Sequence, residues 1–428
     1  MIKLLKNCTY LDKEFKFIKG DILIEDGIII DIKDNIEKNN HKVDSIFNCN
    51  DYFVLPGFVN GHTHDPSSLF RGIFKDKSLG DWFDNSHQGK LQKKAFQYLD
   101  EKITKEEFHI LMLKSFSEYL RQGITTVVET GQSDIPDVYE WTEEVINSSN
   151  LRAVLDVYDS IDQYYKKNNE FIKYCTHLPE EELLEDQNLP DLVEIKNNYP
   201  SLRMTHCLET IKRKKIINNK FHRTTVELYD KFNLLDKNTL LFHCTYVNNN
   251  DIEIIADRQA SIVYCPVSNY WSGAGYAPLE KFLQEDINVL LGTDFLLTDL
   301  WEVMRNTYYY LKTHTELDRY QAKDVFKMVT KNAHDVLFPE IKIGLIDIDY
   351  KADLQFINKE NTNIMPYIDN KDFSTLINNI LIHGRPSMIE NLMIDGKWVL
   401  KDNKIISFDE KYIEKRYKKI LDKIYSDL

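Results

Sequence analysis

The sequence predicts an α/β fold in which a parallel barrel carries a small β-sandwich built from both chain ends. Three observations lead to this prediction. Strand-like apolar runs alternate with helical patterns through the middle of the 428-residue chain. Hairpin-rich segments occur at both ends, and neither is large enough to enclose its own core. The length allows either one large barrel or two domains.

The hairpin signals lie near the two ends of the chain. An Asp-Gly pair at 26–27 separates two β-branched runs, and another at 395–396 separates two apolar runs. Asp-Gly between such runs favours the tight turn of a β-hairpin. We therefore expect residues 1–54 and 353–428 to form one β-sandwich, with an amphipathic helix over 412–425.

Residues 55–352 show the alternation that predicts the barrel. The clearest helix begins at Thr104 with a Thr-x-x-Glu capping box, continues with apolar positions at helical period, and ends at Gly123. Strand-like runs cover residues 125–129, 151–157, 240–244, 262–265 and 289–291, and helical patterns cover 278–286 and 299–312. No glycine-rich nucleotide-binding fingerprint follows these runs. Repeated strand-then-helix units at this length favour a parallel barrel over a doubly wound sheet.

The composition argues against several classes of partner. A formal net charge of -14 disfavours nucleic acid and anionic membranes. No stretch approaches the roughly 18 apolar residues of a membrane span, and the apolar run at the start is too short for a signal peptide. The six cysteines form no Cys-x-x-Cys pair, which indicates reduced, mostly buried thiols in a cytoplasmic protein.

Histidine and carboxylate residues stand at the ends of separate apolar runs. His62 and His64 lie two positions apart on an extended segment, so both imidazoles face the same side. Four more such residues follow other runs: His206, Glu209, His243 and Asp294. Nitrogen and carboxylate ligands from separate strand ends, with room for water, are typical of a catalytic metal site.

One divalent ion is expected to bind this group, with His62, His64, His206 and Asp294 as its ligands. Zinc is expected and iron is the alternative, because this ligand set suits both. Such an ion lowers the pKa of its bound water from 15.7 to about 7, which gives hydroxide at neutral pH. We expect Glu209 to move protons beside the open position and His243 to hydrogen-bond the hydroxide or a developing oxyanion. The other histidines, His177 among them, lack such placement and are expected to be surface or packing residues. His87 is the partial exception, because it is expected in a loop near the mouth of the barrel.

Taken together, the motifs resemble those of the metal-dependent amidohydrolase superfamily, in the branch of chlorohydrolases and aminohydrolases that act on nitrogen heterocycles. The matching pieces are Pro-Gly-Phe-Val-Asn-Gly-His-Thr-His, Leu-Phe-Arg-Gly, His-Cys-Leu-Glu-Thr, Cys-Pro-Val-Ser-Asn and Leu-Gly-Thr-Asp, which span nearly the whole chain. The resemblance implies a (β/α)8 barrel of TIM type with one metal ion on the four ligands named above. It also implies that Glu209 and His243 handle protons and that Asp294 takes a proton from the attacking water.

Two departures from the resemblance bear on the substrate. Many ring deaminases of this branch carry a Trp-Pro-x-Glu-like stretch after the Asp-Trp pair that is residues 81–82 here, and residues 85–92 lack it. In nucleoside-type relatives the missing glutamate helps to hold the sugar, so this departure disfavours a nucleoside. Phe295 follows Asp294 where a small residue is usual, which predicts a narrower pocket.

The expected activity is hydrolytic deamination of an amino-substituted purine, pterin, pyrimidine or triazine ring, as in amidohydrolases that act on non-peptide C–N bonds. Two alternatives stay open: dechlorination or amide or amidine cleavage by the same hydroxide, and a non-catalytic scaffold that kept the fold. The candidate substrate contacts are Arg71, Trp82, His87, Gln88 and Phe295. The expected partner is a small-molecule substrate, and the resemblance is compatible with a homodimer.

Overall fold

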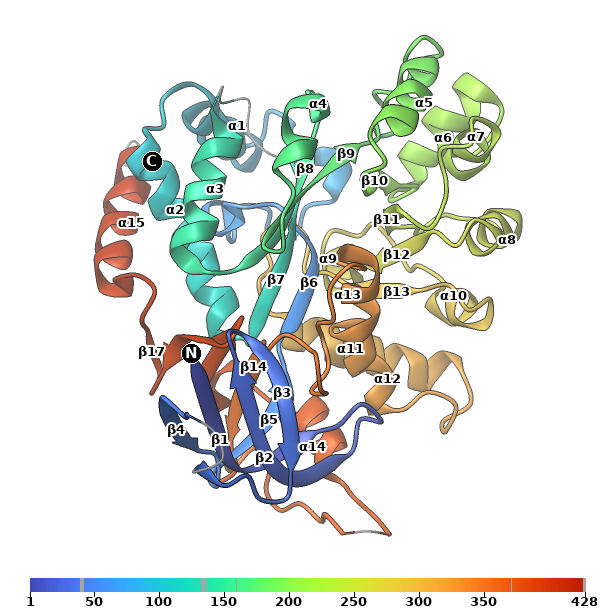
Figure 1. The fold of residues 1–428 in the computed structure, drawn as a ribbon. Helices are drawn as coiled ribbons and strands as arrows, with labels where there is room; N and C mark the ends of the chain where they lie inside the picture. The colour runs from blue at the N-terminus through green and yellow to red at the C-terminus, as the bar shows by residue number, and fades with distance from the viewer. Residues whose placement is uncertain (39–41, 132–134, 136, 159, 371, 426–428) are drawn as a thin grey trace.

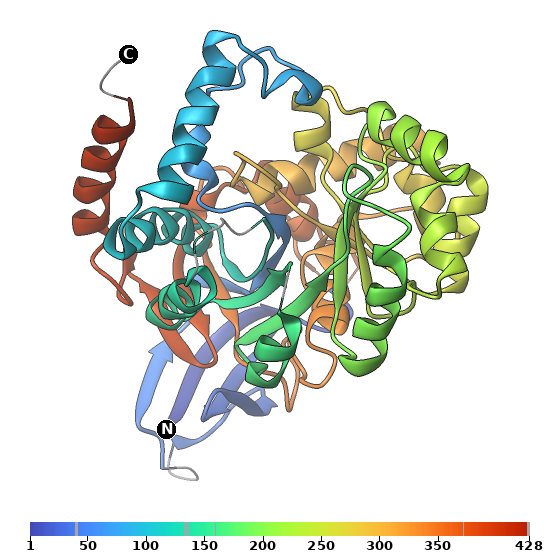
Figure 2. The same ribbon diagram turned by 90° about the horizontal axis from the view of Figure 1, so that it is seen from above.

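The computed structural model describes residues 1–38, 42–131, 135, 137–158, 160–370 and 372–425. Within these ranges the chain forms two sheets. One is an eight-stranded parallel sheet that curls into a barrel surrounded by helices. The other has nine strands from both chain ends and lies at one end of the barrel (Figures 1 and 2). The predicted fold class is confirmed.

The barrel strands follow one another in chain order, each parallel to its neighbours. They are β6 (Phe58–Thr63), β7 (Ile124–Glu129), β8 (Arg152–Val157), β9 (Ile172–His177), β10 (Arg203–Cys207), β11 (Thr239–His243), β12 (Ser261–Tyr264) and β13 (Val289–Leu291). The barrel closes between β13 and β6, where the Asp294 N–H donates to the His62 carbonyl oxygen at 2.9 Å. A bridge between Thr63 and Asp294 extends this contact.

The helices of the barrel are α1 (His87–Glu101), α2 (Lys105–Arg121), α3 (Val138–Ser149), α4 (Ile161–Tyr164), α5 (Asn188–Asn198), α6 (Ile211–Phe221), α7 (Thr225–Lys231), α8 (Asn249–Asp257), α9 (Pro266–Trp271), α10 (Leu279–Gln284), α11 (Leu300–His314), α12 (Ala322–Met328) and α13 (Lys331–Leu337). Most of these helices lie between successive barrel strands along the chain, and α11 to α13 follow the last barrel strand. Helix α2 begins at the predicted capping box: the Thr104 hydroxyl accepts from the Glu107 N–H, and the Glu107 carboxylate accepts from the Thr104 N–H. No helix in the described part of the chain is both long and apolar enough to cross a membrane.

The two chain ends share one mixed sheet, in which β5 pairs antiparallel with β14. Its strands are β1 (Ile2–Leu11), β2 (Phe17–Glu25), β3 (Ile28–Lys33), β4 (Ser45–Asn48), β5 (Tyr52–Pro56), β14 (Leu354–Asn358), β15 (Ile389–Ile394), β16 (Lys397–Lys401) and β17 (Lys404–Ile405). The predicted hairpins are β2–β3 and β15–β16. Buried side chains of both ends, such as Leu5, Val54 and Phe356, pack into a common core.

Two further helices belong to the C-terminal part. Helix α14 (Leu376–His383) packs beside α11 and α12, and α15 (Glu410–Tyr425) lies along α2. The Tyr417 and Tyr425 hydroxyls of α15 donate to the carbonyl oxygens of Ser68 and Leu69, each at 3.1 Å. The C-terminal helix therefore holds the segment that follows the first barrel strand.

A buried ion pair joins the barrel to the terminal sheet. Arg152, at the start of β8, donates to both carboxylate oxygens of Asp353 at 3.1 and 3.3 Å, and both side chains are buried. The same carboxylate accepts from the Asp395 N–H at 2.7 Å. These contacts fix the sheet of the chain ends to the amino-terminal end of a barrel strand.

Replacing Asp353 by alanine is expected to lower the free energy of unfolding by about 3 kcal/mol, because it removes the main charge partner of a buried guanidinium. The midpoint of urea denaturation measures this loss. Glu144→Ala is the control, since it removes an exposed partner of Lys105 and is expected to leave the midpoint unchanged. Equal midpoints for Asp353→Ala and the unaltered protein would contradict the account of this junction.

Candidate metal centre

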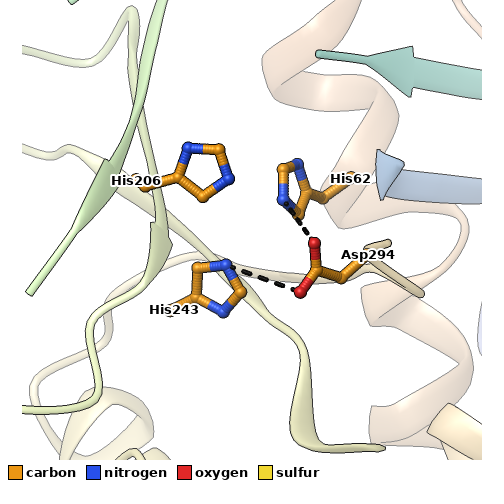
Figure 3. A group of neighbouring side chains, drawn as sticks. All are labelled: His62, His206, His243 and Asp294. Atoms are coloured by element: carbon orange, nitrogen blue, oxygen red, sulfur yellow. Dashed lines mark ion pairs between the residues drawn. The ribbon is translucent and has the colours of Figure 1, made fainter. Parts of the chain in front are cut away.

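Side chains from four barrel strands meet at the carboxyl-terminal rim. They are His62 in β6 with His64 just after it, His206 in β10, His243 at the end of β11 and Asp294 after β13. Four of them, His62, His206, His243 and Asp294, are buried and offer ligand atoms within 4.8 Å of one another (Figure 3). The chain therefore has a buried site of histidines and one aspartate that can hold a metal ion.

The spacing around His64 fits a single ion. His64 Nε2 lies 3.2 Å from His62 Nε2 and 3.2 Å from His206 Nε2. Asp294 Oδ1 lies 3.2 Å from His62 Nε2 and 3.4 Å from His64 Nε2. Ligand atoms about 2.0–2.2 Å from a common tetrahedral ion lie roughly 3.3–3.6 Å apart, so these four distances are close to the spacing that such an ion imposes. Burial lowers the pKa of His62 and of His206, which leaves both imidazoles in the neutral form that binds a cation.

Neighbouring polar groups orient two of the rings. Thr130 Oγ1 lies 3.2 Å from His62 Nδ1, and Asn269 Oδ1 lies 2.9 Å from His243 Nδ1. A ring nitrogen engaged in this way leaves the other nitrogen, Nε2, to face the centre. The two imidazoles are thus held in position by the protein itself.

The aspartate presents its two oxygens to different partners. Oδ1 of Asp294 faces His62 and His64, and Oδ2 accepts a hydrogen bond from Ser268. Oδ2 also lies 3.8 Å from His243 Nε2, which in turn lies 3.9 Å from Glu209 Oε1. In the described part of the chain, this His243 nitrogen is buried without a hydrogen-bond partner. Arg213 holds the other Glu209 oxygen at 3.1 Å. Two carboxylates and one imidazole therefore converge where protons can be exchanged.

The backbone at the rim is bent to aim these side chains. His243 has φ 68° and Asp294 has φ 65°, both in the left-handed region that non-glycine residues seldom adopt. Each such residue costs about 1–3 kcal/mol, which the surrounding structure must offset. Gly292 permits the close approach of β13 to β6, because a Cβ there would come within 2.7 Å of the His62 Cβ. The Leu-Gly-Thr-Asp motif thus places Asp294 opposite the histidines.

A row of polar side chains that the sequence did not predict lies beside the centre. His177, which was expected to be a surface or packing residue, is buried with Nδ1 2.9 Å from Asp156 Oδ2 and Nε2 3.2 Å from Glu180 Oε2. Burial lowers the pKa of His177, but the two carboxylates outweigh burial and raise it to about 10. The signal that could have found this row is a repeated His-x-x-Glu spacing, at 177–180 and 206–209, on neighbouring strand ends.

A cavity of about 640 Å³ opens beside the centre. His64, His206, Glu209 and Asp294 form part of its wall. Aromatic side chains form another part: Phe70, Trp82, Phe83, Phe96 and Phe295. The wall also contains two buried atoms that lack a hydrogen-bond partner within the described ranges, Gln92 Oε1 and Ser272 Oγ. This wall suits a planar ring with a few polar substituents.

The predicted substrate contacts divide into two groups. Trp82 and Phe295 line the cavity, and their ring centroids are 5.9 Å apart. Among the described residues, the lining does not include Arg71, His87 or Gln88. The Arg71 guanidinium pairs with the Glu118 carboxylate of α2 at 2.7 Å, and the Gln88 amide donates to the carbonyl oxygen of residue 75 at 2.7 Å. His87 is the first residue of α1.

Comparison with known proteins agrees with this geometry. The profile of the Amidohydrolase family matches residues 53–399. A 5-methylthioadenosine/S-adenosylhomocysteine deaminase of Pyrococcus horikoshii is 27% identical over 422 residues, which cover 94% of this chain and 95% of the relative. A 5'-deoxyadenosine deaminase of Methanobrevibacter smithii is 27% identical over 452 residues and 98% of each chain.

Among solved structures, an adenosine deaminase from Xanthomonas campestris with bound zinc superposes with a TM-score of 0.86. The superposition covers 99% of this chain and 98% of the other, at 18% sequence identity, and therefore shows a shared fold. The family profile spans most of the chain and includes every residue of the metal centre. The predicted resemblance is confirmed: the chain belongs to the amidohydrolase family.

Proposed function

We propose that this protein hydrolytically deaminates an amino-substituted purine nucleoside, with one zinc ion on His62, His64, His206 and Asp294. The observation that carries the proposal is the convergence of Glu209, His243 and Asp294 beside this ligand set and next to the cavity. The names of the two relatives reported above describe deaminases of adenosine derivatives. The zinc in the similar adenosine deaminase structure supports the choice of metal. The predicted homodimer and cytoplasmic location stay predictions.

A nucleoside requires groups that can hold a sugar. The Trp-Pro-x-Glu-like stretch that serves this purpose in many relatives is absent from residues 85–92. From the sequence alone, this absence disfavours a nucleoside as the substrate. The cavity, however, is lined by two polar side chains of α1, Gln92 and Asp100. Their oxygens are acceptors of the kind that sugar hydroxyls need. We propose that α1 supplies the sugar contacts in place of the missing glutamate.

The proton transfers follow from the side chains around the centre. A divalent ion bound there would supply activated water, because coordination lowers the pKa of water to about 7. Asp294 Oδ2 and His243 Nε2 are placed to take up and hold the proton that this water loses. Glu209 can pass this first proton to a ring nitrogen of the bound purine, and the proton that remains on the added hydroxyl can then be relayed through Asp294 and Glu209 to the departing amine. The water oxygen replaces the exocyclic amino group on the ring carbon, and ammonia leaves.

Glu209→Gln is expected to lower the rate of ammonia release from 5'-methylthioadenosine by about 10²–10⁴-fold, because an amide cannot exchange the proton. Bound zinc should stay at the level of the unaltered protein, since Glu209 is not among the proposed ligands. The matched control is Glu185→Gln, an exposed glutamate paired with Lys220, which should keep full turnover. Turnover close to that of the unaltered protein for Glu209→Gln would remove this residue from its role.

The metal content gives a second test. Elemental analysis of purified protein is expected to find about one equivalent of zinc per chain, and Asp294→Ala should reduce it to about a tenth, because three neutral imidazoles remain without the anionic ligand. Less than about half an equivalent in carefully handled unaltered protein would favour the non-catalytic scaffold instead.

A substrate panel separates deamination from the other hydrolytic reactions. Zinc-loaded protein is expected to release ammonia from 5'-methylthioadenosine, S-adenosylhomocysteine and 5'-deoxyadenosine. A chlorotriazine in the same panel should release no chloride. Chloride release without ammonia would favour the dechlorination alternative and would contradict the proposed reaction.

A further inference from the structure

Glu180 contacts two histidines at once. Its Oε1 lies 3.0 Å from Nδ1 of the metal-site residue His206, and its Oε2 lies 3.2 Å from Nε2 of His177. On the far side, His177 Nδ1 lies 2.9 Å from Asp156 Oδ2. All four residues are buried. They form a continuous hydrogen-bonded row, here called the Asp156–His206 row, from the end of β8 across β9 to β10.

The row fixes the orientation of Glu180. Carboxylates accept hydrogen bonds, so His177, with one carboxylate on each ring nitrogen, donates to both. The ring of Tyr158 stacks on His177, with centroids 3.8 Å apart and planes inclined by 22°. Glu180 therefore cannot turn away from His206 without giving up a charge-assisted hydrogen bond to His177.

Glu180 differs in charge from the groups that support the other rings. His62 has the Thr130 hydroxyl at its Nδ1 and His243 has the Asn269 amide, and both supports are neutral. A carboxylate at Nδ1 of His206 holds the ring proton on that nitrogen, so the lone pair of Nε2 points at the centre. It also makes the imidazole a stronger donor to a cation.

We propose that Glu180 is a positioning residue for the metal: it sets the tautomer and ring orientation of His206, and His177 with Asp156 holds it in place. This inference rests on the proposed metal site and is independent of the reaction that the site catalyses. It assigns a role to a carboxylate that touches neither the proposed ligand atoms nor the proton-handling group of Glu209, His243 and Asp294.

The test measures metal binding and requires no activity. Metal-free protein is titrated with Zn²⁺ against a chelator, and Glu180→Gln is expected to raise the Kd by about 10–100-fold. The matched control is Glu181→Gln, which alters an adjacent buried glutamate whose Oε1 accepts from the Leu208 N–H and the Thr225 hydroxyl, both at 2.7 Å. This control should lower the stability of the fold and leave the Kd unchanged.

A Co²⁺-loaded sample adds a readout that a purely structural role would not move. Glu180→Gln is expected to shift the visible ligand-field absorption of bound Co²⁺, because the donor strength of His206 changes, whereas Glu181→Gln should leave the spectrum unaltered. Should Glu180→Gln not fold, His177→Asn provides the same comparison, since it releases Glu180 from the row and is expected to raise the Kd.

An unchanged Kd together with an unchanged Co²⁺ spectrum in the folded variant would overturn the proposal. The result of this metal-binding test can be distinguished from the result of the ammonia-release test of the proposed function. A raised Kd in Glu180→Gln supports the inference even if the unaltered protein releases no ammonia from any nucleoside.

Discussion

Closure of the barrel between its last and first strands is the constraint on which the site depends. The Asp294 N–H donates to the His62 carbonyl oxygen, so this one backbone contact both closes the sheet and sets the aspartate beside the histidines. Gly292 makes the approach possible, because any side chain there would meet His62. The candidate metal centre therefore depends on the closed barrel, because closure places Asp294 opposite His62.

The two oxygens of Asp294 separate two tasks. Oδ1 lies beside His62 and His64, and Oδ2 faces His243, whose Nε2 also faces Glu209. Burial keeps His62 neutral and available to a cation. In the proposed reaction, this aspartate binds the ion through one oxygen while the other takes part in proton transfer.

Much of the fold and of the centre could be predicted because the signals are local. The capping box at Thr104, the Asp-Gly hairpins and the strand-end histidines each depend on a few neighbouring residues. Strand β9 was not predicted, because Lys173 interrupts its apolar run. The Asp156–His206 row was not predicted either, because Glu180 meets His206 only through tertiary packing. Arg71 was expected at the substrate for a related reason: no local pattern shows that Glu118, on a different helix, takes its guanidinium. Likewise, hairpin signals do not specify that β5 pairs with β14, which joins the chain ends into one sheet.

The most direct test of this account is a crystal structure of the zinc-loaded protein with anomalous scattering recorded at the zinc edge. The account predicts a single peak within about 2.0–2.2 Å of Nε2 of His62, His64 and His206 and of Oδ1 of Asp294, with His243 Nε2 outside the coordination shell. A peak bound by His243 in place of His64, or no peak at the rim, would contradict the assignment of roles on which the proposed chemistry rests.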